Sequence, residues 1–343
     1  MSRLLEHRRR EPAPDVFRLI LPLPFPGLDR VNVYLLKDEE TTTLVDCGIY
    51  FPDPDRDHGW DELVAGLEAA GATPGDVKRL VVTHPHIDHY GMAGRFVRET
   101  GCELWMHEAS TGDLDLYRDP DTTRHHLREM LKDHGVQREE LDELTSYEDW
   151  RAFVSEVVEP TTPLRGGEKL EAARRVWEIV HTPGHSAAHV CLFDATERIL
   201  IAGDHLLPTI TPHIDFRRGE GDPLGEFLDS LHKVEELAPA LVLPGHGHPF
   251  EDGAERARVV SRHHDRRLGA ITQVIRKKAR TADQITDEIF GTELLNFQRR
   301  LALGEALAHL AYLRRRGEVE RLEAEDGTFV YRKARRPHQV EEE

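Results

Sequence analysis

Cysteine is scarce in this chain, and long apolar runs are absent from it. Among 343 residues the cysteines are Cys47, Cys102 and Cys191, and no two of them have C-x-x-C spacing. We therefore expect reduced, buried thiols and no disulfide framework, which is typical of a cytoplasmic protein. There is no apolar run long enough for a membrane-spanning helix, which needs about eighteen residues. Residues 1–14 lack an apolar segment, so we expect no signal peptide.

Positive charge is also in deficit. The net charge is −18, which argues against a nucleic-acid grip over the whole surface. The imbalance is uneven, because residues 1–254 hold 26 basic against 48 acidic side chains, whereas residues 255–343 hold 19 against 15. A hydrophobic fraction of 39% is enough for a real core. We expect a large first domain over residues 1–252 and a small second one over residues 253–334.

Three imidazoles and one carboxylate stand within six residues, at His84, His86, Asp88 and His89. They follow the apolar run Leu80–Val82, which predicts a buried strand that ends in a loop. An H-x-H-x-D-H array cannot lie on one helix face, but a loop can direct all four side chains to one point. Neutral imidazole with carboxylate suits zinc, iron or manganese. The alternative is a polar loop with histidines at chance density, since the chain carries 21.

The same arrangement, an apolar strand followed by a polar residue, recurs four times. In layered α/β domains the loops at one strand edge form the usual chemical site, so these side chains should converge. Asp46 could hold a ligand histidine through a hydrogen bond or could form an Asx-type turn, and its own segment does not decide between them. The strands and the residues that follow them are Thr43–Val45 with Asp46, Val176–Val180 with His185, Arg198–Gly203 with Asp204, and Leu241–Leu243 with His246.

Residues of about 110–160 interrupt the alternation of strands and helices. Helices are expected over Thr122–His134, Glu139–Leu144 and Ser146–Val158. One interpretation is a helical insertion that caps the site and shapes the substrate pocket. The other is decoration or a subunit contact, as in a homo-oligomer. The wall residues of the cap would be Tyr117, Met130, Tyr147 and Trp150.

Beyond residue 252 the pattern changes to helices. We expect one long basic helix over Ala254–Arg280, a short one over residues 281–290, and an amphipathic one over Phe297–Leu313. A small hairpin should follow around Glu325-Asp326-Gly327. Helices followed by a two-stranded wing resemble a winged-helix module. Residues 335–343 are expected to be a disordered tail.

Taken together, the motifs T-H-x-H-x-D-H, H-T-P-G-H-S, G-D-H and P-G-H-G resemble the metallo-β-lactamase superfamily, particularly its glyoxalase II-like branch. The resemblance covers roughly residues 16–252. The C-terminal part is similar to the winged helix of lactamase-beta-2-like proteins. The implied fold is an αββα sandwich of two mixed sheets, with helices outside and metals at one edge, plus the helical insertion and the winged-helix-like domain.

The resemblance also implies roles for individual residues. The first metal would be held by His84, His86 and His185, the second by Asp88, His89 and His246, and Asp204 would bridge the two. Asp88 and Asp204 would be the catalytic carboxylates, and Asp46 would lie behind the metals. Tyr90, His189, His205 and His248 are further candidates for supporting a ligand or contacting substrate. We expect two divalent cations, zinc first, with iron or manganese as alternatives.

The chemistry that follows is hydrolysis. Two divalent cations carry more positive charge than Asp88, Asp204 and a bridging hydroxide neutralise, which favours a carbonyl or phosphoryl oxygen that gathers negative charge. We expect a thioester, ester or lactone as the substrate, a small acyl compound in a cytoplasmic protein without membrane contact. Oxygen-dependent chemistry at a single iron is the minority alternative.

Two other function classes stay open. A metal-dependent nuclease or phosphodiesterase acting on single-stranded nucleic acid would use the basic C-terminal helix, with phosphate contacts that weaken with salt. A sensor would use the winged helix to bind nucleic acid without turnover. The basic run comprises Arg256, Arg258, Arg262, Arg266, Arg267, Arg276, Lys277, Lys278 and Arg280, but such a run is more often a solvated helix face.

Overall fold

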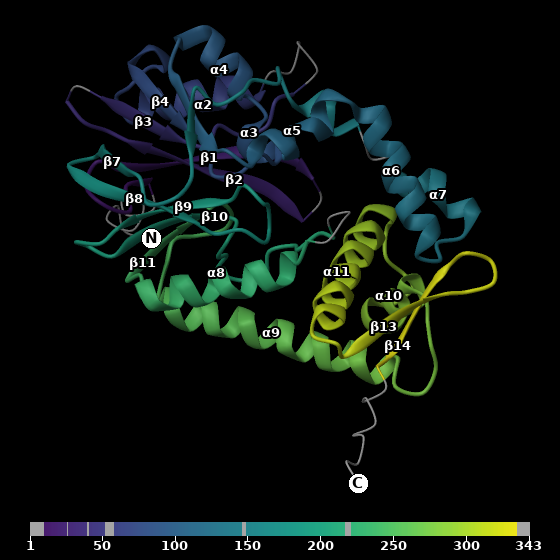
Figure 1. Ribbon diagram of the computed structural model, residues 1–343. Coiled ribbons are helices and arrows are strands. Elements are labelled where there is room, and N and C mark those ends of the chain that lie inside the picture. The colour runs from purple at the N-terminus through teal and green to yellow at the C-terminus, as the bar shows by residue number, and fades with distance from the viewer. Residues whose placement is uncertain are drawn as a thin grey trace. The chain divides into compact units, whose positions relative to one another are not determined.

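The computed structural model describes residues 10–25, 27–39, 41–51, 58–145, 149–216 and 221–334 (Figure 1). These residues pack into two compact units. One lies within residues 1–120, 148–212 and 226–261, and the other within residues 121–147, 213–225 and 262–343. This grouping differs from the continuous first domain over residues 1–252 that the sequence suggests, because residues 121–147 of the expected insertion pack with the C-terminal region.

Two six-stranded sheets form the first unit. The first sheet follows chain order, with β1–β3 antiparallel and β3–β6 parallel; in the second, β10 and β11 are parallel and the other pairs are antiparallel. The first sheet contains β1 (Val16–Phe25), β2 (Leu28–Leu36), β3 (Thr42–Val45), β4 (Val77–Val81), β5 (Glu103–His107) and β6 (Thr162–Leu164). The second contains β7 (Lys169–Ala172), β8 (Arg175–His181), β9 (Val190–Asp194), β10 (Ile199–Gly203), β11 (Leu241–Pro244) and β12 (Phe250–Glu251).

Strand alternation divides the core of this unit into two layers. In β2, Val33 and Leu35 pack with the helices, whereas Tyr34 and Leu36 pack against the second sheet. Successive strand residues point to opposite faces, so the apolar residues 33–36 of β2 contribute side chains to both layers of the core. Trp177 of β8 is fully buried between the sheets, and its indole nitrogen donates to the Ala172 carbonyl at 3.0 Å.

Helices cover the outer faces of the sheets. Leu63 and Leu67 of α2, one turn apart, enter the core beside β1. Ser230 of α8 donates to the Pro183 carbonyl at 2.9 Å beside the second sheet (Figure 1). The helices of this unit are α2 (His58–Ala69), α3 (Ile87–Tyr90), α4 (Ala93–Thr100), α5 (Ser110–Arg118) and most of α8 (Pro223–Leu237). The αββα sandwich is therefore confirmed.

The second unit is mainly helical and has its own core, built from residues such as Leu131, Ile271 and Leu307. Thr281 accepts a hydrogen bond from the Gln284 amide at 3.2 Å and so caps the N-terminus of α10. The expected hairpin is present as β13 (Val319–Glu323) paired with β14 (Phe329–Lys333); the winged-helix assignment itself stays a prediction. The helices are α6 (Pro120–Asp133), α7 (Arg138–Thr145), the C-terminal part of α9 (Gly253–Val274), α10 (Ala282–Phe290) and α11 (Asn296–Arg315).

Two helix predictions were wrong in part. Over Ser146–Val158 the described residues contain a single 3-10 turn, η3 (Asp149–Phe153). The backbone beyond η3 binds the histidine loop, the segment of residues 83–91 that carries His84, His86 and His89. The amide of Ser155 donates to the Gly91 carbonyl at 2.8 Å. The basic helix ends at Val274, not Arg280, because Arg280 pairs its backbone with Tyr331 at the edge of the hairpin. None of the described helices is long and apolar enough to cross a membrane.

The second unit should be sensitive to acid through His134. Its Nδ1 lies 3.0 Å from the Tyr331 hydroxyl, and burial together with Arg321 and Arg314 lowers the pKa of His134 to about 4. Because the unfolded chain binds this proton near its ordinary pKa of 6.5, stability is present above that value and is lost as the pH falls toward the folded pKa. The loss should be about 3 kcal/mol between pH 7.5 and pH 4.

Urea unfolding of the metal-free protein checks this expectation. A His134→Gln variant, which keeps a polar group beside Tyr331, should lack that part of the pH dependence. Parallel pH profiles for the two proteins would contradict it.

Candidate metal centre

Every predicted metal ligand lies at one edge of the two sheets in the first unit. The histidine loop follows β4, and the other three ligands follow β8, β10 and β11. The loops therefore bring together side chains from distant parts of the chain. The groups in which donor atoms lie within 4.8 Å of one another are His84, His86 and His185; His84, His89 and Asp204; and Asp88, His89 and His246.

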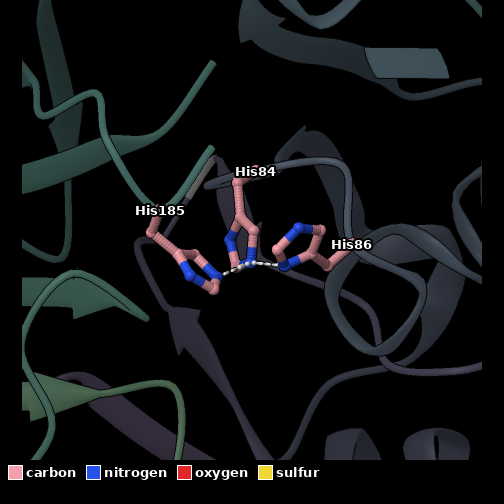
Figure 2. Close-up of side chains that lie close together, drawn as sticks. All are labelled: His84, His86 and His185. Atoms are coloured by element: carbon pink, nitrogen blue, oxygen red, sulfur yellow. Dashed lines mark hydrogen bonds between the residues drawn. The ribbon is translucent and has the colours of Figure 1, made fainter. Parts of the chain in front are cut away.

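Three imidazoles define the first group. Figure 2 shows His84, His86 and His185 directing ring nitrogens toward one another. His84 Nε2 lies 3.0 Å from His86 Nδ1 and 3.2 Å from His185 Nε2. Nitrogen ligands of a tetrahedral zinc ion, with bonds of about 2.0–2.1 Å, are separated by roughly 3.3 Å. The spacing is thus that of three ligands of one cation.

Asp204 lies between two of these groups, the one formed by His84, His86 and His185 and the one formed by Asp88, His89 and His246. Its Oδ2 is 3.8 Å from His185 Nε2 and 3.3 Å from His246 Nε2, and its Oδ1 is 3.4 Å from His89 Nε2. His246 Nε2 is also 3.2 Å from Asp88 Oδ2. One carboxylate therefore faces both groups, as the position expected for a bridging ligand requires.

The donor atoms themselves fit divalent cations. Nε2 of His89, Nε2 of His246 and Oδ1 of Asp204 are buried and make no hydrogen bond within the described part of the chain. Buried polar atoms are otherwise almost always satisfied, so such atoms facing one another indicate a missing partner. Imidazole and carboxylate without thiolate are suitable ligands for zinc, iron or manganese. The residues present therefore fit two such ions.

The histidines and aspartates of this cluster shift one another's pKa values strongly. Burial opposes ionisation, yet His246 and His89 hold the pKa of Asp204 well below its ordinary value. Asp204 and Asp88 overcome burial at His246 and raise its pKa to about 10. At His84, burial and the neighbouring imidazoles lower the pKa instead. The pKa of Asp88 is likewise lowered, to about 2, by His89 and His246, so both carboxylates are ionised, and a cation that binds His246 must displace its proton.

Asp46 sets the orientation of two of the histidines. Its carboxylate accepts hydrogen bonds from the Thr83 hydroxyl at 2.9 Å and from His89 Nδ1 at 2.8 Å. The Thr83 oxygen then accepts from His84 Nδ1 at 3.0 Å. Protons on both Nδ1 atoms leave the Nε2 lone pairs of His84 and His89 directed at the cluster. Asp46 holds a left-handed backbone, with φ of 64°, as is frequent for residues at functional sites.

Replacing Asp46 by asparagine should weaken metal binding and hydrolysis together, by about 10–100-fold. The amide would keep the size of the side chain but remove the charge that orients His89. Titration of the metal-free protein with zinc, followed by kinetics, measures both effects. Asp61→Asn, at an exposed position of α2, is the matched control and should behave as wild type. Unchanged zinc affinity in Asp46→Asn would contradict this role.

The β2 strand holds the loop that carries His246. The His246 Nδ1 atom donates to the Arg30 carbonyl at 2.8 Å, so its Nε2 is also left as the ligand atom. Asn32 donates to the Pro244 and Gly247 carbonyls at 2.8 and 2.9 Å, and the Tyr34 hydroxyl donates to Pro244 at 2.8 Å. Asn32, Tyr34 and Thr83 are not among the site residues predicted from the sequence. A polar Asn32 inside an apolar strand was the available signal.

His189 supports Asp204 through the backbone. Its Nε2 accepts from the Asp204 amide at 3.1 Å, and its Nδ1 lies 2.8 Å from the Thr182 hydroxyl. The first bond requires a lone pair on Nε2, so Nδ1 carries the proton and donates to Thr182. His189 therefore positions a ligand, as one of the two interpretations of this residue expects.

The remaining candidates lie apart from the ligand groups. His205 is fully buried against the ring of Phe227, with centroids 5.2 Å apart. His248 is exposed and lines a cavity beside His246. The Tyr90 hydroxyl donates to the Val158 carbonyl at 2.9 Å and accepts from its amide, which ties down the segment after η3.

The expected wall residues have structural contacts. Tyr117 is buried and donates to the Pro85 carbonyl at 2.8 Å, beneath the histidine loop. Trp150 packs on Phe25 of the first unit, with ring centroids 5.8 Å apart, and Met130 packs into the core of the second unit. Tyr147 lies outside the described residues. The subunit contact stays a prediction.

A cavity of about 480 Å³ adjoins the cluster at His246. Its walls combine apolar side chains with arginine. Ile20 and Ile210 remain 37% and 51% exposed, so apolar surface is left uncovered beside the site. The volume lies within the usual range for ligand pockets, about 300–1,000 Å³. The lining includes Arg18, Ile20, Leu28, Arg30, Ile210 and His248.

This fold, with two histidine-rich ligand groups sharing one aspartate, defines a metal-dependent hydrolase. The chain belongs to the metallo-β-lactamase superfamily, whose family model matches residues 26–246. A second family model, of the metallo-β-lactamase-like C-terminal domain, matches residues 268–334. The expected resemblance is thereby confirmed, and the enzyme class with it.

Individual relatives are similar over most of the chain. A probable metallo-hydrolase, YqjP of Bacillus subtilis, is 25% identical, covering 87% of this chain and 92% of its own length. The human acyl-coenzyme A thioesterase MBLAC2 is 26% identical over 66% of this chain and 76% of its own. The crystal structure of the metallo-β-lactamase family protein TTHA1429 from Thermus thermophilus is similar with a TM-score of 0.80 and 30% identity, covering 94% and 99% of the two chains.

Proposed function

We propose that this protein hydrolyses acyl thioesters at a dinuclear metal centre, with zinc as the metal. The observation that carries the proposal is the convergence of seven histidine and aspartate side chains at one site, where Asp204 lies near both His185 and His246. When bound, a pair of divalent cations supplies an ionised water at neutral pH and positive charge beside it. No serine or cysteine nucleophile is required by this chemistry.

The residues of the chain supply orientation. His84, His89 and His246 each donate a proton from Nδ1 to a fixed acceptor, so Nε2 is the atom of each ring that faces the cluster. Such preorganisation avoids reorganisation cost at the moment of reaction. Asp204, held through its own amide by His189, directs Oδ2 toward both His185 and His246 and Oδ1 toward His89.

The cavity beside His246 supports an acyl thioester with an anionic leaving group. Ile20, Leu28 and Ile210 offer apolar surface for an acyl chain. Arg30, with a side chain 63% exposed and a contact of 4.0 Å to the neighbouring Asp29, offers a guanidinium for phosphate. The first region of the chain is acidic overall, so arginines at the cavity are a local exception. The similarity to an acyl-coenzyme A thioesterase points to the same substrate class.

The nuclease alternative has less support. Several arginines of the basic run bind neighbouring groups of the chain: Arg256 donates to the Leu207 and Ile210 carbonyls, and Arg258 pairs with Glu235 and Glu255. Arg280 pairs with Glu288. These side chains bind groups within their own units. The basic run is therefore better explained as a solvated helix face than as a surface that binds phosphates of nucleic acid.

A direct comparison of substrates tests the proposal. Zinc-reconstituted protein is assayed on acyl-coenzyme A esters of several chain lengths, on oxygen esters and lactones, and on single-stranded RNA. We expect thioester turnover that disappears on chelation and returns with zinc. His84→Ala should abolish it, and His232→Ala, an exposed histidine of α8, should not.

Other outcomes have definite meanings. Salt-sensitive RNA cleavage without thioester turnover would replace the thioesterase with a nuclease. Tight nucleic-acid binding without any turnover would favour the sensor. Thioester turnover that survives His84→Ala would show that the reaction does not use this centre.

A further inference from the structure

A second cluster of metal-type donors lies in the second unit, outside the centre described above. Its members are His264 on α9 and Glu305 and His309 on α11, two helices labelled in Figure 1. One donor atom from each lies within 4.8 Å of the others. Glu305 and His309 are four residues apart, so both side chains lie on the same face of α11.

The spacing matches that of the first cluster. His264 Nδ1 lies 3.2 Å from His309 Nε2, the same separation as between His84 Nε2 and His185 Nε2. Two imidazoles on one tetrahedral zinc ion are expected at roughly 3.3 Å. Both imidazoles are fully buried.

Hydrogen bonding directs a lone pair of His309 at the cluster. His309 Nδ1 lies 2.7 Å from the Glu305 backbone carbonyl. A carbonyl can only accept, so Nδ1 carries the proton and Nε2 presents its lone pair to His264. Burial lowers the pKa of His264 to about 3 and that of His309 to about 4, so both rings are neutral and able to ligate at neutral pH.

Glu305 supplies the negative charge. Its side chain is only 15% exposed, and Oε1 makes no hydrogen bond within the described part of the chain. The nearest cation is Arg267, at 3.9 Å from Oε1, which is beyond hydrogen-bonding distance. Burial raises the pKa of this carboxyl. Arg267 is thus a distant ion-pair partner that makes no hydrogen bond to Oε1, and a buried carboxylate facing two neutral imidazoles can accept a closer cation.

We propose that His264, Glu305 and His309 bind one divalent cation of the zinc class, which joins α9 to α11 in the second unit. Two imidazoles and one carboxylate are a common zinc donor set. Because the imidazoles are enclosed, the ion has a structural role and does not meet substrate. The proposal is independent of the thioesterase function, since none of its residues belongs to the catalytic cluster.

Metal content per chain tests it. The full-length protein is stripped by chelation, reconstituted with zinc, freed of loose metal and analysed by mass spectrometry against protein concentration. Glu305→Gln and His264→Gln should each contain one zinc equivalent less than wild type, whatever number the catalytic cluster holds. His263→Gln, the neighbouring histidine on α9, should retain the wild-type number.

Two further measurements guard against misfolding. Unfolding of the metal-free proteins by urea shows whether Glu305→Gln is intact, and zinc should then raise the melting temperature of the second unit in wild type but not in this variant. Anomalous scattering at the zinc edge should show a peak between the three side chains. Wild-type zinc content in a folded Glu305→Gln variant, or an anomalous map with zinc at the catalytic cluster alone, would overturn the proposal.

Discussion

Replacing Asp204 by asparagine should lower kcat for acyl thioester hydrolysis on the order of a thousandfold. Its carboxylate lies between the two ligand groups, 3.8 Å from His185 of one group and 3.3 Å from His246 of the other. The amide has almost the same shape but carries no charge and has one acceptor oxygen in place of two. Both cations would therefore lose a shared ligand, and electrostatic stabilisation of this kind contributes about 10²–10³ in rate for a single donor.

Kinetics and metal analysis together check this result. Asp204→Asn should contain less than the wild-type amount of metal, and excess zinc should restore part of the content but little of the rate. Asp229→Asn, on the exposed face of α8, is the matched control. An Asp204→Asn protein that keeps wild-type kcat would remove Asp204 from the reaction and with it the shared-ligand arrangement.

A methyl group at Gly245 should damage the same centre by steric means. A Cβ there would collide with Asp204 Oδ1 and stand 2.8 Å from His89 Cε1 and 3.1 Å from the Gly203 carbonyl carbon. The backbone cannot retreat, because the Gly245 amide donates to Gly203 and its carbonyl accepts from Asn32, each at 2.7 Å. The Asp204 carboxylate must then move. Displacement of a catalytic group by about 1 Å costs on the order of 100-fold in rate, and overpacking costs about 1–3 kcal/mol of stability.

Gly245→Ala is therefore expected to lose about 100-fold or more in kcat/KM and to bind zinc more weakly. Gly112→Ala, in α5, is the control, because a Cβ at that position meets no atom within 4 Å. That variant should stay within about 1 kcal/mol of wild-type stability, and helix propensity favours alanine there. Full activity in Gly245→Ala would show that the loop can shift and that the close approach has no functional weight.

Local pattern was sufficient for most elements of the first unit. Residues 33–36 of β2, residues 80–81 of β4 and the whole of β10 are short apolar runs, so strand is the conformation that these residues favour. Each polar ligand stands directly after such a run, and the edge of the sheet is where a strand releases its chain. For that reason, side chains as far apart as His84 and His246 could be assigned to one edge before any coordinates.

Local pattern was insufficient where backbone groups have distant partners. Residues 154–158 carry helix-compatible side chains, yet Ser155 and Val158 bind Gly91 and Tyr90 instead of forming helix. Arg280 lies beyond the end of α9 and pairs its backbone with that of Tyr331, some fifty residues later. The partners that orient the ligands, such as Asn32 beneath the His246 loop, were equally out of reach because they depend on which strands are neighbours.

The amino-acid sequence by itself was enough to indicate the superfamily and, through that resemblance, the sandwich of two sheets and the ligand residues, because each histidine motif lies within a single loop after a strand. The tertiary structure alone decided which nitrogen of each histidine faces the cluster, that His189 supports Asp204, and that residues 121–147 pack with the C-terminal helices. It also brought His264 beside His309. The physical reason is that most of these features depend on hydrogen bonds or packing contacts between residues far apart in the chain, as between His246 and Arg30.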